Sequence, residues 1–245
     1  MKLSELIPNS NIKVLCIGDS GAGKTVFATS FPGKKHVADF DGKIVSAANF
    51  YRRHEAARIA DIDYEDHFET QGAADSYARF YSTLVRFETE AKAGKLSINT
   101  YVLDSLTTFF DAFLREVMRQ NPSIKGPAPG IPSIQHYGIA TPKFKEQLGR
   151  ILALPCHVVV TAHIDVSKDE VSGEIIRSAK LPGKLSSYLP IVFGEVYRAY
   201  AEQGKDGKIV YMAQTKSDSK FTCRSQISGL PDRVPLSYES LVKAY

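Results

Sequence analysis

Eight consecutive residues, at positions 18–25 with the sequence GDSGAGKT, have the types and spacing of a phosphate-binding loop. In the pattern GxxxxGK[ST], glycines let backbone N–H groups converge on phosphate oxygens. Lys24 is then placed to reach the β- and γ-phosphates, and the Thr25 hydroxyl to bind Mg²⁺. The pattern arises by chance in roughly 1% of chains of this length, so it predicts a site for ATP or a similar nucleoside triphosphate. The expected contacts are Gly18, Asp19, Ser20, Gly21, Ala22, Gly23, Lys24 and Thr25.

An acidic partner for the metal is predicted at Asp104, which closes the apolar run TYVLD at residues 100–104. Such a run indicates a buried strand whose carboxyl end opens at the same sheet edge as the phosphate-binding loop. We therefore expect Thr25 and Asp104 to hold Mg²⁺ together. The alternative is that Asp104, or its neighbour Ser105, caps a helix beginning at Leu106.

Further polar side chains follow two other expected strands. Asp39 and Asp41 lie at the carboxyl end of the strand expected at 36–40, where a carboxylate can orient the attacking water. Asp41 is the first choice for this role. Asp39 is the second choice and is also expected to contact the nucleotide. His163 follows the strand expected at 156–162 and would face the γ-phosphate, where it could report hydrolysis. The alternatives are a solvated turn aspartate and a strand-end histidine bonded to a loop.

The elements that position these residues alternate along the first two thirds of the chain. Strands are predicted at residues 12–17, 36–40, 100–104 and 156–162, and helices at 24–30, 43–60, 72–93, 106–120 and 144–154. Later strands are predicted at 174–179, 192–201, 208–214 and 221–225, with a hairpin turn at 204–207. The order predicts one α/β domain spanning 1–245, with a mostly parallel central sheet flanked by helices and antiparallel C-terminal edge strands.

Two segments are expected to form loops. Residues 121–142 hold five prolines and three glycines, and an irregular segment of this length inside a compact domain usually has a function. Residues 165–190 form a second loop region, and 1–11 an N-terminal extension.

Composition excludes several classes of protein. No apolar run approaches the roughly 20 residues that span a bilayer, and the N-terminus lacks the charge and apolar pattern of a secretory signal. Three scattered cysteines without a CxxC pair favour a reducing compartment, so we expect a cytoplasmic protein with no membrane partner. A net charge of +4 permits an anionic partner without requiring one.

The ordered set GDSGAGKT, DFDGK, TYVLDS and VVVTAH resembles the RecA-core ATPases. In particular it is similar to a phage-encoded group of AAA or RecA-like nucleotide-binding proteins that includes the Sak-type single-strand annealing recombinases. The resemblance covers roughly residues 13–224 and implies a RecA-like P-loop NTPase core that uses ATP and Mg²⁺. It further implies a homo-oligomer, ring or filament, that binds single-stranded DNA in the host cytoplasm, with a phage single-strand binding protein as a further partner.

The resemblance also assigns roles to individual residues. Asp41 falls where RecA-like proteins carry a catalytic glutamate; the aspartate is one methylene shorter, which leaves its reach to the water open. His163 falls near their sensor glutamine. Basic residues that complete the ATP site of a neighbouring subunit correspond here to Lys216, Lys220 and Arg224. The alternative for these three is a solvated hairpin.

A DNA-binding region is expected in the proline-rich stretch. Residues 119–145 carry four basic side chains and no acidic one, and a tyrosine offers a ring for base stacking. The expected contacts are Arg119, Lys125, Tyr137, Lys143 and Lys145. A second, more nearly neutral candidate is 165–184. The alternative is that both are exposed linkers with ordinary lysines.

Three functions are compatible with these features. The first is a DNA-stimulated ATPase that oligomerises on single-stranded DNA and promotes annealing or recombination. The second is a nucleotide-switched interaction protein in phage replication without direct DNA activity. The third, a small-molecule or nucleotide kinase, is least favoured because the long loop lacks an arginine-rich lid.

Overall fold

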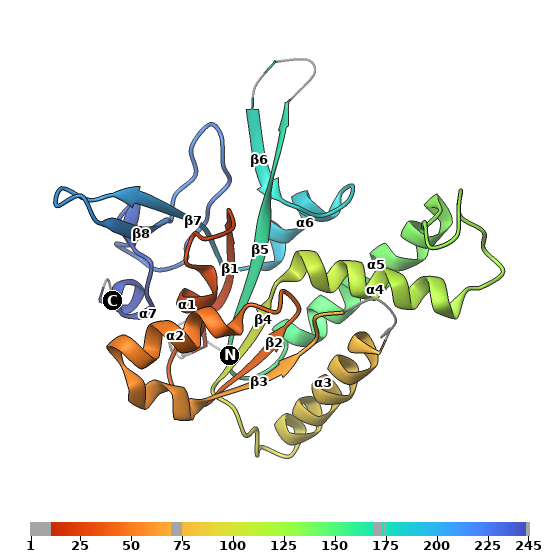
Figure 1. Ribbon diagram of the computed structural model, residues 1–245, viewed down its shortest axis with the longest axis horizontal. Coiled ribbons are helices and arrows are strands. Elements are labelled where there is room, and N and C mark those ends of the chain that lie inside the picture. Colours follow the sequence, from red (N-terminus) through yellow and green to blue (C-terminus); the bar gives the residue numbers. More distant parts are fainter. Residues whose placement is uncertain (1–10, 70–74, 169–172, 174, 244–245) are drawn as a thin grey trace, which may run out of the picture.

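The computed structural model describes residues 11–69, 75–168, 173 and 175–243, and its centre is one large sheet (Figure 1). The strands run in the order β3-β2-β4-β5-β1-β7-β8-β9, and β6 pairs with the outer part of β5. Their bounds are β1 Lys13–Gly18, β2 Lys35–Asp39, β3 Ile62–Asp66, β4 Thr100–Asp104, β5 His157–Lys168, β6 Ile175–Ala179, β7 Glu195–Gln203, β8 Ile209–Gln214 and β9 Arg233–Pro235. The helices are α1 Lys24–Thr29, α2 Ile44–His54, the 3₁₀ helix η2 Ala56–Asp61, α3 Ser76–Lys92, α4 Leu106–Gln120, α5 Ile134–Leu152, α6 Leu185–Val192 and α7 Tyr238–Val242.

The sheet is parallel from β3 through β7. β1 pairs in parallel with β5 and β7, β2 with β3 and β4, and β4 with β5. β8 and β9 add antiparallel strands at one edge. A parallel sheet must be covered on both faces, and β2 and β4 are accordingly buried along their whole length. The predicted fold class is confirmed; the predicted N-terminal extension lies, except for Asn11, outside the described residues.

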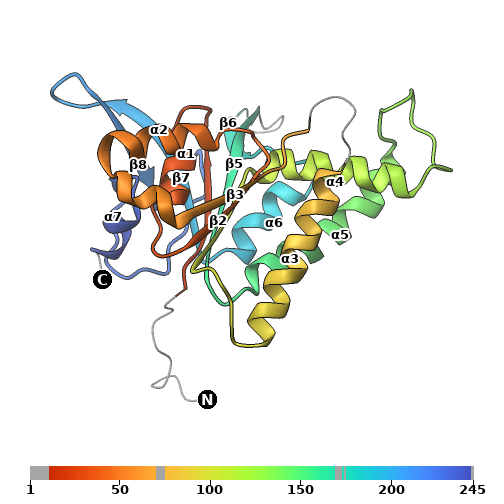
Figure 2. The same ribbon diagram turned by 60° about the horizontal axis from the view of Figure 1, so that its bottom comes forward.

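Helices cover the two faces as separate layers (Figure 2). Side chains of β1 alternate between them, as the pleat of a strand requires. Leu15 and Ile17 belong to the core formed with α3, α4, α5 and α6, whereas Val14 and Cys16 belong to the core formed with α1, α2 and α7. Both cores therefore hold the P-loop strand in place.

The proline-rich segment is shorter and more ordered than the sequence predicts. Helix α5 begins at Ile134, not near residue 144, so only residues 121–133 form the connection between α4 and α5. Ser133 caps the helix, and its backbone N–H donates to His136 Nδ1 at 2.9 Å. Pro142 lies inside α5 although it removes one backbone donor. The buried face of the helix, which includes Phe144 and Leu148, offsets that loss.

The predicted second loop region also contains regular structure. β5 continues beyond the parallel sheet to Lys168 and forms an antiparallel hairpin with β6, which extends away from the molecule in Figure 1. Residues 185–192 are α6, so β7 starts at Glu195 and not at 192. Residues 169–172 and 174 lie outside the described part.

Two other boundaries differ from prediction. The helix expected over 43–60 is divided into α2 and η2. Residues 221–225 are not a strand: Arg224 makes one bridge to Val196, and the Asp218 side chain accepts from the backbone N–H groups of Lys220 and Phe221. Local side-chain bonds of this kind compete with strand pairing.

The packing of α5 on α4 is testable at Phe144. The centre of its ring lies 4.9 Å from the ring centre of Phe110 and 5.5 Å from that of Phe109. Phe144→Ala should lower the free energy of unfolding by about 3–5 kcal/mol because it leaves a cavity in the core. Urea denaturation measures the loss. Ile134→Ala is the matched control on the same helix, since that side chain is 87% exposed; equal losses in both variants would contradict the docking of α5.

Candidate functional site

The phosphate-binding loop joins β1 to α1 with a backbone that depends on glycine. Gly18 lies between β5 and β7, and a side chain there would collide with the carbonyl oxygen of Ala199. Gly21 and Gly23 have φ of 80° and 83°, a conformation that other residues rarely adopt. Gly23 is also the N-cap of α1. A glycine-dependent turn into the start of a helix is the backbone arrangement that binds phosphate in P-loops.

Lys24 is held inside this loop. Its Nζ donates to the carbonyl oxygens of Gly18 at 2.8 Å and Asp19 at 2.7 Å. Burial lowers the pKa of Lys24, although nearby acidic groups including Asp104 oppose the shift. A phosphate beside the loop would add the negative charge that stabilises this ammonium.

Thr25 and Asp104 meet as predicted, although they are 79 positions apart. Thr25 Oγ1 donates to Asp104 Oδ2 at 2.6 Å, and Thr161 Oγ1 donates to Asp104 Oδ1. Asp104 is almost fully buried, and burial raises its pKa. The capping alternative is not supported for Asp104, because the Ser105 side chain accepts the backbone N–H of Thr108 and caps α4.

These oxygens fit Mg²⁺. A carboxylate and a hydroxyl are hard ligands, and Mg²⁺ commonly takes one or two carboxylates with phosphate and water completing its shell. A cation there would offset the cost of keeping Asp104 charged while buried. Within the described ranges, no group of three His, Cys, Asp or Glu side chains could hold a metal without other ligands. The site therefore suits a metal that arrives with a nucleotide.

Asp41 and His163 form a second pair above the same sheet edge. His163 Nε2 donates to Asp41 Oδ2 at 2.8 Å, while Ser105 and Thr108 donate to Oδ1 at 2.8 and 2.5 Å. Burial alone would raise the pKa of Asp41, but the hydrogen bonds from His163, Thr108 and Ser105 outweigh it and hold the pKa well below its usual range. Asp41 is thus an ionised carboxylate, fixed in orientation, at the cavity wall.

Asp39 has a different task from the one predicted. Its carboxylate oxygens accept the backbone N–H groups of Lys43 at 3.1 Å and Ile44 at 2.9 Å. It therefore fixes the start of α2, where backbone donors lack helical partners. It is not among the described residues that line the cavity, so the structure favours Asp41 as the carboxylate that faces a substrate.

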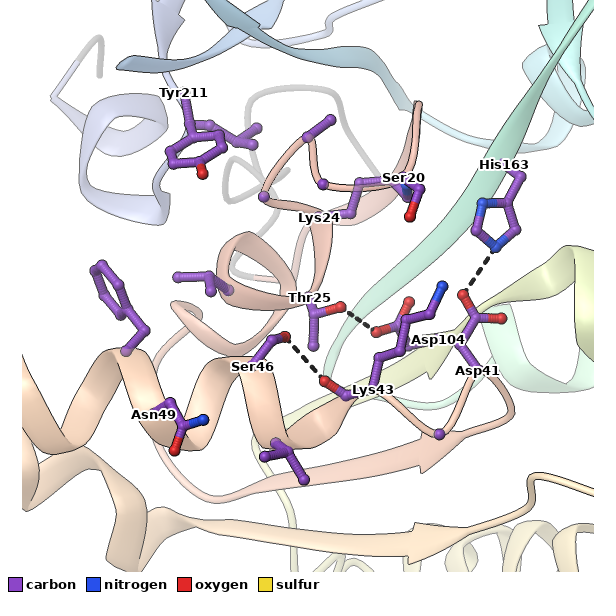
Figure 3. Close-up of a pocket in the computed structure, with 18 residues that line it drawn as sticks. Ser20, Lys24, Thr25, Asp41, Lys43, Ser46, Asn49, Asp104, His163 and Tyr211 are labelled. Atoms are coloured by element: carbon purple, nitrogen blue, oxygen red, sulfur yellow. Dashed lines mark hydrogen bonds and ion pairs between the residues drawn. The ribbon is translucent and has the colours of Figure 1, made fainter. Parts of the chain in front are cut away.

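One cavity of about 760 Å³ joins the P-loop to Asp104, Asp41 and His163 (Figure 3). The P-loop, Asp104, Asp41 and His163 form its polar part. Its other walls were not predicted from the sequence. α2 and the turn before it contribute Lys43, Val45, Ser46, Asn49 and Phe50, and the C-terminal part contributes Tyr211 of β8 and Leu236, which follows β9. Lys43 was within reach of prediction, since it belongs to the DFDGK segment. No local sequence pattern predicts a role for Tyr211, which reaches the cavity because β8 pairs with β7.

The predicted DNA contacts do not lie in one loop. Arg119 is paired through two hydrogen bonds with Glu116. Lys143 and Lys145 lie on α5 and not in a loop; Lys143 lines a second cavity between α3, α4 and α5, whereas Lys145 Nζ lies 4.3 Å from the Tyr188 ring centre. Residues two apart on a helix point in different directions.

The remaining two candidates also lie in different elements. Tyr137 is half-buried against the core and stacks toward Phe110, with ring centres 6.5 Å apart. Lys125 is exposed in the connection between α4 and α5, where its Nζ donates to the carbonyl oxygen of Pro122 at 3.1 Å. The five residues therefore do not share one proline-rich loop, and their contact with DNA stays a prediction.

The three basic residues predicted to act on a neighbouring subunit follow β8. Lys216 forms an ion pair of 2.5 Å with Asp232, and Lys220 and Arg224 are exposed. None of them lines the cavity of its own chain. Their action in a neighbouring site stays a prediction. No helix in the described part of the chain is long and apolar enough to cross a membrane.

The fold and the site together define a RecA-like P-loop NTPase core. The model of the AAA_24 family, an AAA domain, matches residues 10–225, and the chain belongs to that family. Among solved structures, an ATPase of the type III secretion system of pathogenic bacteria aligns with a TM-score of 0.51 and 10% identity, over 77% of this chain and 52% of that one. This chain thus spans about half the length of that ATPase.

A KaiC-like protein from Pyrococcus horikoshii OT3 aligns with a TM-score of 0.45 and 13% identity, over 91% of this chain and 84% of that one. No curated protein matches the chain. The family assignment therefore rests on the AAA-domain match, and the similarity to the secretion ATPase concerns the fold.

The Asp41 network should make stability depend on pH. A carboxyl whose pKa is lowered by folding stabilises the folded state above its unfolded pKa of about 4, and this contribution disappears as pH falls. Asp41→Asn should thus reduce the free energy of unfolding at neutral pH, with a smaller reduction near pH 3. Urea denaturation at both pH values measures this, with Asp63→Asn, an exposed aspartate of β3, as the control. A pH-independent difference would contradict the network.

Proposed function

We propose that this protein is an Mg²⁺-dependent ATPase. The observation that carries the proposal is that one cavity joins the P-loop, the Thr25–Asp104 pair and the Asp41–His163 pair. A protein that only held a nucleotide would need the first two features. The third adds an ionised carboxylate, aimed by three hydrogen-bond donors, beside the space for the terminal phosphate.

Each residue has a role in this mechanism. The P-loop backbone and Lys24 hold the phosphates, and Thr25 and Asp104 would hold the metal, which neutralises charge on the phosphate oxygens. Asp41 orients the attacking water by accepting its hydrogen bond. His163 keeps Asp41 ionised and in position, and it stands directly opposite Gly18 in the β1–β5 register. The end of the P-loop strand and His163 are therefore neighbours in the sheet.

A kinase is less well supported. Phosphoryl transfer to a second substrate needs groups that bind the acceptor and exclude water. Among the described residues that line the cavity, none is an arginine, and the basic ones are Lys24, Lys43 and His163.

Single-stranded DNA binding and assembly into a homo-oligomer are further parts of the proposal. The β5–β6 hairpin supports the first: it begins next to His163, whose carbonyl oxygen accepts the Lys180 N–H at 2.8 Å, and it carries Lys168 and Arg177. The exposed Lys216, Lys220 and Arg224 support the second, since they could reach a neighbour's cavity. A role in phage annealing or recombination rests on the resemblance to the Sak-type group; a nucleotide-switched interaction protein without DNA activity is the alternative.

ATP hydrolysis tests the site. Lys24→Ala should abolish hydrolysis because the contact to the β- and γ-phosphates is lost. Asp41→Asn should keep nucleotide binding and lower kcat by roughly 100-fold or more, because the water is no longer oriented. Phosphate release measures kcat, and calorimetry measures binding. Lys34→Ala, an exposed lysine at the other end of β2, is the control; hydrolysis by purified Lys24→Ala protein would refute the assignment.

DNA binding is tested by comparing two sets of substitutions. Lys168→Ala with Arg177→Ala should weaken binding of an oligothymidine strand and reduce the slope of log affinity against log salt by about 1–2, because up to two phosphate contacts are lost. It should also reduce any stimulation of ATPase activity. The triple variant Lys125→Ala, Lys143→Ala, Lys145→Ala, the set expected from the sequence, should have a smaller effect. The reverse order would place the DNA on the α4–α5 side, and no binding by the wild type would favour the interaction-protein alternative.

A further inference from the structure

Lys43 is a second lysine in the nucleotide cavity. It follows Asp41 by two positions, in the turn that connects β2 to α2, and it lines the cavity together with the P-loop. In Figure 3 its side chain extends from the start of α2 into the space beside Asp104 and Asp41. It reaches this space from the wall opposite the P-loop.

The backbone of Lys43 is fixed on both sides. Its N–H donates to Asp39 Oδ1 at 3.1 Å, and its carbonyl oxygen accepts from the Ser46 hydroxyl at 2.9 Å and the Ser46 N–H at 3.0 Å. Gly42 before it has φ of 66°, and a side chain at Gly42 would press against the Phe68 ring. The buried Asp39 carboxylate therefore fixes the backbone position of Lys43. Only the Lys43 side chain is free to change conformation.

The ammonium of Lys43 has no partner among the described residues. No hydrogen bond or ion pair joins its Nζ to any of them, whereas the side chains of Lys24, Asp41, Asp104 and His163 in the same cavity are all bonded. Its charge nevertheless acts on the site. Burial is the main cause of the lowered pKa of Lys24, and the Lys43 charge lowers that pKa further. An unpaired cation thus faces the space where phosphates are expected.

The position of the Lys43 ammonium is on the side of the cavity where the γ-phosphate is expected. The P-loop and Lys24 approach a triphosphate from one side, and Asp41 must lie beyond the γ-phosphate to hold a water in line with it. Lys43 arises from the same turn as Asp41. A side chain from there that enters the cavity meets the γ-phosphate before the α- and β-phosphates.

We propose that Lys43 contacts the γ-phosphate and is a catalytic residue supplied by the same chain. In hydrolysis, the water oxygen bonds to the γ-phosphorus, and the bond to the bridging oxygen breaks with its electron pair remaining on ADP. Both water protons end on the released phosphate, so ATP⁴⁻ and H₂O give ADP³⁻ and H₂PO₄⁻. Lys43 stabilises the charge on the γ-phosphate oxygens during this step. This inference rests on the proposed ATPase function.

The role predicts a difference between triphosphate and diphosphate. Lys43→Ala should raise the Kd of the β,γ-imido analogue of ATP about tenfold, the usual order for one charge-assisted hydrogen bond, and leave the Kd of ADP unchanged. It should also lower kcat roughly 100-fold. Lys43→Arg keeps the positive charge and should therefore show a smaller rise in the Kd of the ATP analogue and a smaller loss of kcat. Calorimetry with Mg²⁺ and each nucleotide gives the binding, with Lys34→Ala as the matched control.

Two outcomes separate this inference from the function on which it rests, and a thermal melt controls for folding. Wild-type protein that binds neither nucleotide overturns the proposed ATPase itself. Wild-type protein that binds both, with the ratio of their Kd values unchanged in Lys43→Ala, overturns the role of Lys43 alone. A thermal melt of Lys43→Ala that matches the wild type shows that a loss of triphosphate binding is not a loss of fold, since the α2 contacts are made by the backbone at this position.

Discussion

The hydrogen bond between Thr25 and Asp104 depends on the order, the direction and the ends of the central strands. It requires that β1 and β4 run in the same direction and end at the same level, although β5 lies between them. Thr161 on β5 completes the contact by donating to the other oxygen of Asp104. A carboxylate buried this deeply is tolerable only because it is bonded to both hydroxyls and lies beside Lys24. The parallel direction of β1, β5 and β4 thus brings these side chains together at one edge of the sheet.

A second set of bonds builds on the first. Ser105, next to Asp104, caps α4 and donates to Asp41, so the end of β4, the start of α4 and the turn after β2 are joined. His163 extends the set to β5, and β5 continues without interruption into the hairpin with β6. The nucleotide cavity and a projecting arm of the molecule therefore share one strand.

Sequence patterns were reliable where a residue's neighbours are local. The P-loop strand and helix and the strand ending in Asp104 follow from short apolar runs and glycines, and the structure has them within a few residues. The third strand starts within one residue of its expected position but continues past His163 to Lys168. Helix α5 was predicted to start too late because five prolines suggested a loop, whereas the packing of Phe144 and Leu148 on α4 stabilises a helix that includes Pro142. Tertiary burial there outweighs local preference.

The sequence by itself determined the phosphate-binding motif, the acidic residue that ends a neighbouring strand and the fold class that presents both. Those properties belong to short segments with strong local constraints. Only the tertiary structure decided how the two aspartates after β2 divide their tasks, since Asp39 turns back to the α2 backbone and Asp41 faces His163. It alone also placed Lys43 and Tyr211 in the cavity and separated Lys143 from Lys145. The direction of a side chain depends on contacts between segments far apart in the chain, and a local pattern does not contain them.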